Sequence, residues 1–212
     1  ISMVLIFIIS LYFGIKSALN KNSFFDKFTG QLSLLSFAMP SFYLALLLVL
    51  IFAINFEILP IAGLHGVAND GSFNYYLDYA WHLVLPIFII VFGGIGSLIL
   101  YIRSLTIEIL KSDYIFFAKA RGLTSKQILR YYILPNLYPP VITLLGLSLP
   151  GIIGGSVILE TIFSIDGMGL LFYQSALSHD YPVIMGILII GAFLTLIGNM
   201  IADLVLLKLN PN

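Results

Sequence analysis

The sequence predicts an all-α protein that crosses a membrane several times, and three observations carry this prediction. Of its 212 residues, 60% are hydrophobic and only 9% are charged, with a mean hydropathy of +1.06. Soluble domains are about 45–50% apolar and about 25% charged, and disordered chains need low hydrophobicity and excess charge. The charged residues, moreover, are separated by long charge-free stretches. A polytopic membrane protein is the class that remains.

The charge-free stretches locate the spans. A bilayer core about 30 Å thick needs about 20 mostly apolar helical residues. The predicted spans are residues 1–15, 32–56, 80–102, 137–159 and 182–204, within one transmembrane domain over 1–207. Because the first stretch is shorter than a span and the chain begins with Ile1, we expect that upstream sequence is missing and that the intact protein has six spans.

The basic residues predict the orientation of the spans. All ten Lys and Arg residues follow the first, third or fifth span, and the two remaining loops contain none. Basic residues accumulate on cytoplasmic loops, so these three segments and the carboxyl terminus are expected in the cytoplasm. The balanced net charge argues against a nucleic-acid partner, and the absence of cysteine excludes thiolate metal sites.

Small residues gather in two of the predicted spans. Gly93, Gly94 and Gly96 lie in the third span, and Gly154 and Gly155 lie in the fourth. Small residues let helix backbones approach closely in lipid. A hinge or a channel lining is the functional alternative.

The cytoplasmic loop over 104–135 is patterned like two short helices that meet at a glycine. Ser112 or Asp113 can cap a helix that runs through Arg121, with Gly122 as the stop. Thr124 or Ser125 can cap a second helix, in which apolar residues recur at helical spacing. Such an elbow suits insertion into a groove on a partner protein, or an amphipathic position on the lipid surface.

The same residues resemble a known family. The stretch from Asp113 to Thr124, which includes Ala118-Lys119-Ala120-Arg121-Gly122-Leu123, is similar to the loop signature of permease subunits of binding-protein-dependent ABC importers. Further similar blocks include Met39–Phe42, His82–Pro86, Thr143–Leu147, Gly154–Phe163, Gly167–Gly169 and Asp180–Val183. They resemble the oligopeptide/dipeptide/nickel branch, and its first permease subunit. The superfamily's Glu-Ala-Ala is replaced here by Phe116-Phe117-Ala118, so no glutamate role carries over; the peptide branch also departs from Glu-Ala-Ala at this place.

The resemblance implies a type I ABC importer fold and a role in transport, with peptides as the expected substrate and nickel or another small solute as the alternative. The 113–135 segment would couple to a cytoplasmic ATPase through Ala118, Lys119, Ala120, Arg121, Gly122 and Leu123. The implied partners are a second homologous permease, two ATPase subunits and an extracytoplasmic binding protein, in the cell membrane of a prokaryote. The chain itself contains no phosphate-binding loop motif, so ATP is expected to be used by the partner and no cofactor by this chain.

Few other residues suggest chemistry. Glu160 lies near the outer end of a predicted span, where an ionisable group contacts the pathway or supports a helix end; with Gly154 and Gly155 it is a candidate gate. His65, His82 and His179 are scattered, which favours structural roles over a metal site. An ion-driven carrier and an intramembrane enzyme are the alternative classes. Apart from Asp203 at the end of the last span, however, the complete spans carry no charge, and no catalytic constellation is present.

Overall fold

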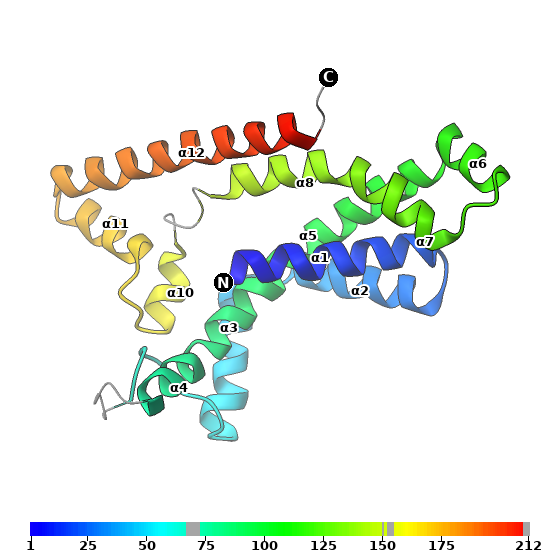
Figure 1. Ribbon diagram of the computed structural model, residues 1–212. Coiled ribbons are helices and arrows are strands. Elements are labelled where there is room, and N and C mark those ends of the chain that lie inside the picture. The colour runs from blue at the N-terminus through cyan, green and yellow to red at the C-terminus, as the bar shows by residue number, and fades with distance from the viewer. Residues whose placement is uncertain (67–72, 150, 152–154, 210–212) are drawn as a thin grey trace. The chain divides into compact units, whose positions relative to one another are not determined.

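A computed structural model describes residues 1–66, 73–149, 151 and 155–209, and every regular element among them is helical (Figure 1). The longer helices are α1 (Ser2–Leu19), α2 (Phe24–Ala38), α5 (Val84–Leu110), α8 (Leu134–Ser148) and α12 (Tyr181–Leu209). The shorter ones are α3 (Ser41–Leu48), α4 (Phe73–His82), α6 (Asp113–Ala120), α7 (Ser125–Ile128), α10 (Val157–Ile162) and α11 (Met168–Leu177). Two π-helical segments, η1 (Val49–Asn55) and η2 (Leu129–Ile133), continue α3 and α7.

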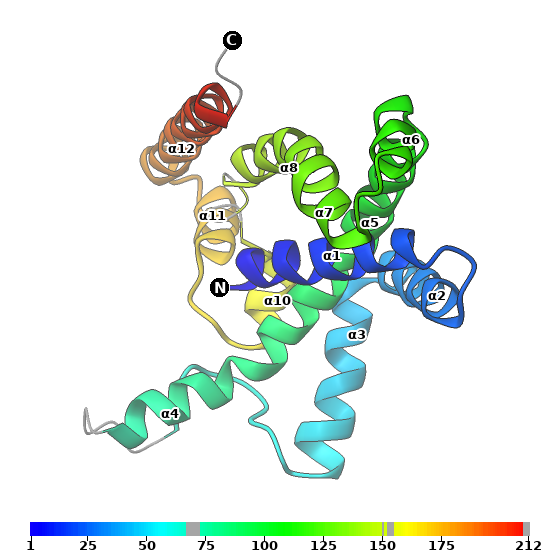
Figure 2. The same ribbon diagram turned by 45° about the vertical axis from the view of Figure 1, so that its right-hand side comes forward.

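The chain forms two compact units. The first consists of residues 1–40 and 90–141, and the second of residues 41–89 and 142–212. In the first unit α1 and α2 are packed side by side, as both ribbon views show (Figures 1 and 2). In the second unit α10 packs against α3 and α11, and α11 packs against α12.

Three helical stretches in the described part of the chain are long and apolar enough to cross a membrane, namely Ser2–Leu19, Asn74–Leu110 and Tyr181–Lys208. They agree with the predicted first, third and fifth spans. A fourth candidate is a bent pair, Phe24–Ala38 with Ser41–Asn55, whose two halves meet at 98°.

The predicted second span, 32–56, is therefore not one straight helix. Met39 ends α2 in an extended conformation with φ −84° and ψ 120°, and α3 begins only at Ser41. Pro40 explains the break, because a proline disfavours helical geometry in the residue before it and has no backbone N–H to donate. The prediction of a single span over 32–56 did not allow for a break at this proline.

The predicted fourth span, 137–159, also differs. Helix α8 ends at Ser148, and α10 does not begin until Val157. Just before α10, Gly155 has φ +54° and Ser156 is extended, so a continuous α-helix is broken there. Pro139 and Pro140 lie in the helix without ending it.

Small residues set the helix spacing in the first unit. A Cβ on Gly96 of α5 would lie 2.4 Å from the carbonyl oxygen of Ser33 in α2, and one on Gly94 would lie 2.5 Å from Ile6 in α1. The Gly96 N–H also donates to Ser36 Oγ at 3.1 Å. The predicted packing role is thus confirmed for these two glycines, whereas Gly93 has no atom within 4 Å of such a Cβ.

Helix α2 buries small polar residues and exposes large apolar ones. Thr29, Ser33 and Ser36 are each only 1% exposed, whereas Phe24 is 84% and Phe37 is 70% exposed. Outward-facing apolar side chains and small polar side chains at helix contacts are what lipid-embedded helices show. The pattern supports a membrane position for this helix.

Candidate functional site

The elbow is built around the left-handed conformation of one glycine. Helix α6 ends at Ala120, Arg121 is its C-cap, and Gly122 has φ +80°, a region that residues with a Cβ rarely adopt. The N–H of Gly122 donates to the Lys119 carbonyl at 2.9 Å, and that of Leu123 to the Ala118 carbonyl at 3.2 Å. These bonds satisfy the last carbonyls of the helix. The predicted helix stop is confirmed.

The second helix of the elbow starts with a capping box. Thr124 Oγ1 accepts the N–H of Gln127 at 3.3 Å, and Gln127 Oε1 accepts the N–H of Thr124 at 2.8 Å. Reciprocal bonds of this kind satisfy two otherwise unpaired donors at a helix start. Of the two predicted caps, Thr124 and not Ser125 is the residue that the structure uses.

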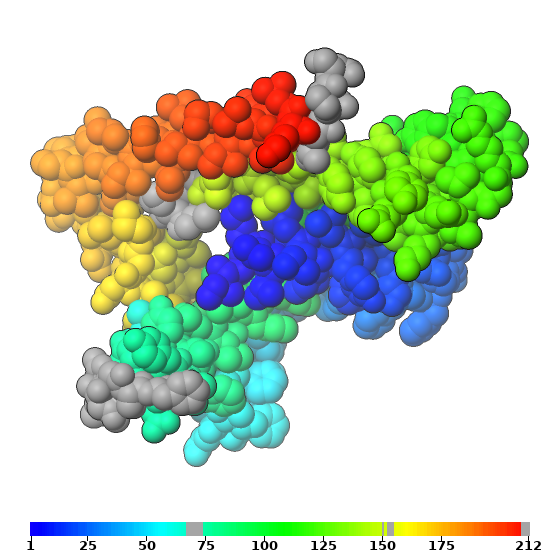
Figure 3. Space-filling view, viewed as in Figure 1, coloured from blue at the N-terminus to red at the C-terminus, as the bar shows by residue number. Residues whose placement is uncertain are grey.

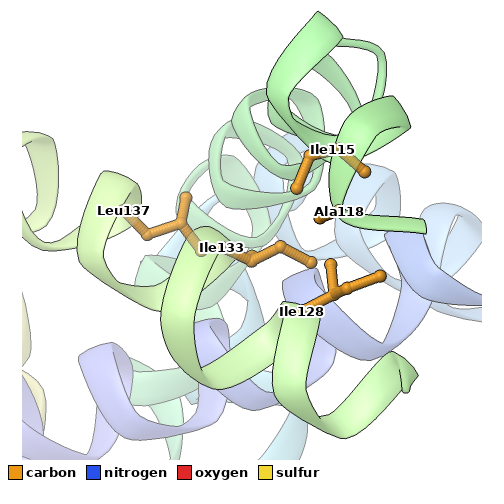
Figure 4. Packing of buried hydrophobic residues seen from close by; sticks show 5 residues of the cluster. All are labelled: Ile115, Ala118, Ile128, Ile133 and Leu137. Carbon is orange, nitrogen blue, oxygen red and sulfur yellow. The ribbon is translucent and has the colours of Figure 1, made fainter. Parts of the chain in front are cut away.

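The elbow has a hydrophobic core of its own. Five buried side chains from α6, α7, η2 and α8 meet in it, as Figure 4 shows: Ile115, Ala118, Ile128, Ile133 and Leu137. Residues of α1 and α5 pack against this core from the other side, among them Ile15, Leu105 and Ile109. Ala118 is only 2% exposed, so its side chain supports the elbow from within and is not part of its outer surface.

The outer surface of the elbow combines two aromatic rings with basic residues. Phe116 is 69% and Phe117 is 61% exposed, and their rings form an edge-to-face pair 5.8 Å apart. Lys119, Ala120 and Arg121 are exposed beside them. In Figure 3 atoms of the α6 region, in green, are visible at the surface. Sequence reasoning noted the phenylalanines only as a departure from a motif; their exposure, which makes them candidates for contact, required the structure.

Glu160 lies in α10, and its carboxylate bonds to backbone groups of α10 and α11. One carboxylate oxygen, Oε1, accepts the N–H of Ser156 at 3.2 Å, and the other, Oε2, accepts the N–H of Leu170 at 2.5 Å. Ser156 caps α10, and Leu170 lies in the first turn of α11. The arrangement is that of a helix-end residue, one of the two predicted options. Gly155 adjoins this carboxylate, whereas Gly154 lies outside the described residues.

The histidines show no metal site. Among the described residues, no three His, Asp or Glu side chains gather closely enough to hold an ion. His65 stacks on Tyr75 with a centroid distance of 4.2 Å, and its Nε2 lies 2.8 Å from the Tyr75 hydroxyl. His82 Nδ1 lies 2.8 Å from the backbone oxygen of Asp78.

Together these features describe a polytopic helical membrane protein that presents a capped, internally packed elbow. The family described as "Binding-protein-dependent transport system inner membrane component" matches residues 10–212. The chain belongs to this family. The predicted resemblance and the predicted fold class, an all-α membrane protein of the type I ABC importer kind, are confirmed.

Curated relatives carry names from peptide transport. The chain is 36% identical over 211 residues to "Oligopeptide transport system permease protein AppB" of Bacillus subtilis, covering 100% of this chain and 66% of that protein. It is 36% identical to OppB of the same description from Haemophilus influenzae, covering 93% and 61%. It is 34% identical to "Dipeptide transport system permease protein DppB" of Bacillus subtilis, covering 99% and 64%. The chain thus spans slightly less than two thirds of the length of these relatives.

Proposed function

We propose that this chain is a permease subunit of an ATP-driven importer for peptides and forms half of its translocation pathway. The family and the names of the relatives support this proposal. The proposed partners are a second permease, two ATPase subunits and an extracytoplasmic binding protein. In this proposal the segments rich in Lys and Arg, and with them the elbow and the carboxyl terminus, face the cytoplasm.

The observation that carries the proposal is the construction of the elbow. A passive connector needs no internal core, no capping box and no glycine in a left-handed conformation, yet this segment has all three. Its inner face is fixed to α1 and α5, and its outer face exposes large apolar side chains. A rigid protrusion of this kind suits a groove on a partner, here the ATPase subunit that hydrolyses ATP.

Phe116 and Phe117 are the proposed anchors of that contact. Buried aromatic side chains commonly dominate the binding energy of an interface, and the pair is held outward by the burial of Ile115 and Ala118 on the opposite face of α6. Lys119 and Arg121 would then meet acidic residues at the rim of the groove. Ala120, exposed and small, would allow close backbone approach.

Reconstitution of the full-length permease with its partners in proteoliposomes tests the transport proposal. Uptake of a labelled oligopeptide is expected to require ATP on the side of the membrane where the ATPase subunits lie. It is also expected to persist when ion gradients are abolished. Uptake that follows an ion gradient and ignores ATP would overturn the proposal. Uptake of nickel in place of peptide would overturn the substrate assignment alone.

Alanine substitution tests the proposed anchors. Phe116→Ala and Phe117→Ala together are expected to lower co-purification of the ATPase at least about tenfold, because interface hot spots are typically worth more than 1–2 kcal/mol. Phe24→Ala is a matched control, since Phe24 is an exposed phenylalanine of the same unit outside the elbow. Co-purification that is unchanged in the double variant would contradict the assignment and favour a position of the rings in lipid.

A further inference from the structure

One side chain in the second unit bonds to the backbone of two neighbouring helices, α10 and α11. The carboxylate of Glu160, in α10, accepts backbone N–H groups on both sides: Ser156 at the start of its own helix and Leu170 in the first turn of α11. N–H groups in the first turn of a helix have no partner within the helix, and the helix dipole favours a negative charge there. An ionised carboxylate therefore suits both donors at once.

Glycines make the space that this carboxylate occupies. A Cβ on Gly167 would lie 2.3 Å from Glu160 Cδ and within 2.7 Å of both carboxylate oxygens. A Cβ on Gly155 would lie 2.1 Å from Oε1. Real side chains do not come this close, so residues larger than glycine at 155 or 167 would displace the carboxylate from its two donors.

Helices α10 and α11 differ in how much of their apolar surface is buried in the second unit. Helix α10 is fixed within its unit: Leu159 and Phe163 are 6% and 2% exposed, and the Phe163 carbonyl accepts the Gly63 N–H at 2.7 Å. Helix α11, by contrast, leaves Phe172, Tyr173 and Leu177 at least 36% exposed. Figure 1 shows the two helices in yellow and light orange, with α12 following α11 along the chain.

We propose that Glu160 is a positioning residue for transport, which locks α10 and α11 into one hairpin through the bonds of its carboxylate to Ser156 and Leu170. In this role each carboxylate oxygen accepts one backbone N–H, and Glu160 acts on transport through these bonds and not through contact with the substrate. The hairpin Ser156–Leu177 then stays one body during the transport cycle, with α11 held in place through α10. The link to transport rests on the proposed function, but the lock itself does not.

Hydrogen exchange tests the lock without reference to transport. In the full-length permease within its complete transporter, Glu160→Gln replaces one oxygen by an amide group that cannot accept a hydrogen bond. The amide of Ser156 or Leu170 is then expected to exchange roughly ten to a hundred times faster, the range for loss of one charge-assisted hydrogen bond. Glu57→Gln, at an exposed glutamate of the same unit, is the matched control and leaves both amides unchanged. Unchanged exchange in Glu160→Gln overturns the lock.

A second variant is expected to displace the same carboxylate without a substitution at Glu160 itself. Gly167 has φ −100°, which alanine adopts without strain, so Gly167→Ala acts only through its Cβ. It is expected to raise exchange at Leu170 as Glu160→Gln does. In a Glu160→Ala background the clash is gone, and Gly167→Ala is expected to add nothing further. Additive effects of the two substitutions would overturn the shared mechanism.

Uptake kinetics separate positioning from substrate contact. At matched membrane abundance and matched ATPase co-purification, Glu160→Gln and Gly167→Ala are both expected to lower maximal uptake about tenfold or more, with the half-saturating substrate concentration unchanged. A raised half-saturating concentration in Glu160→Gln alone would overturn the proposal and indicate substrate contact. If the wild type shows no ATP-driven uptake, the proposed function fails while the exchange experiments still decide the lock.

Discussion

The guanidinium of Arg103 donates two hydrogen bonds to the carboxylate of Asp26, from Nε to Oδ1 at 2.6 Å and from Nη2 to Oδ2 at 2.9 Å. Ser17 Oγ donates a third bond, at 2.5 Å, and the Asn22 N–H a fourth, at 2.9 Å. Asp26 is only 5% exposed. One carboxylate thus joins the end of α1, the start of α2 and α5, just before the part of α5 that packs on the elbow core.

Removal of the cation from this cluster is expected to destabilise the first unit. Arg103→Leu leaves a buried, unpaired carboxylate, and breaking a buried ion pair on one side costs about 3–5 kcal/mol. The melting temperature of the purified protein in detergent is the measurement. Lys27→Leu, at an exposed lysine one residue from Asp26, is the control and is expected to change little. Equal melting temperatures for the two variants would show that Asp26 is not held as described.

Two glycines three residues apart on α5 are expected to respond in opposite ways to the same substitution. Gly96→Ala would place a methyl group 2.4 Å from the Ser33 carbonyl oxygen and should force α2 and α5 apart. Gly93→Ala meets nothing within 4 Å and should be neutral or stabilising by up to about 1 kcal/mol, the helix propensity difference. Melting temperatures of the two variants check this, and a loss at Gly93 that equals the loss at Gly96 would contradict it.

Substitutions of Gly122 are expected to follow conformational preference and not size alone. A Cβ at this position meets no atom within 4 Å, so its cost comes from the φ of +80°. Asparagine tolerates this conformation, alanine costs about 1–2 kcal/mol, and proline cannot adopt it. Peptide uptake should therefore fall in the order Gly, Asn, Ala, Val, with Gly122→Pro inactive but inserted normally in the membrane. Full uptake by Gly122→Pro would contradict the coupling role of the elbow.

Substitutions of two alanines in α6 are expected to have different effects, one on stability and the other on partner binding. Ala118→Leu overfills the elbow core and should lower stability by about 1–3 kcal/mol. Ala120→Leu, on the exposed face, should leave stability within about 0.5 kcal/mol and instead weaken co-purification of the ATPase. Melting temperature and co-purification are measured on both variants. The reverse pattern would place Ala118, as the motif first suggested, at the partner surface.

Local signals allowed the elbow to be predicted from the sequence. Gly122 as a helix stop and Thr124 or Ser125 as a cap depend on the residues within one turn; the first prediction is confirmed, and of the two caps the structure uses Thr124. The apolar stretches likewise located α1, α5 and α12. The 98° break at Pro40 was missed, because a charge-free stretch carries no information on backbone conformation.

Contacts between residues far apart in the sequence could not be predicted from the sequence. Asp26 and Arg103 are 77 residues apart, and nothing in the local pattern of either indicates the other. Glu160 was recognised as unusual, but its partners depend on the turn that brings Leu170 back to α10. The burial of Ala118 depends in the same way on Ile128 and Ile133, which reach it only when the elbow is folded.

The small core under the elbow has a mechanical consequence. Packed side chains resist compression as organic crystals do, so a displacement applied at Phe116 or Phe117 is not absorbed by bending within the segment. In the proposed coupling role, such a displacement would be transmitted through Ile115 and Ile133 to Leu105 and Ile109 on α5 and to Ile15 on α1. The elbow would then act as a stiff lever arm, and movement of its tip would move the helices at its base.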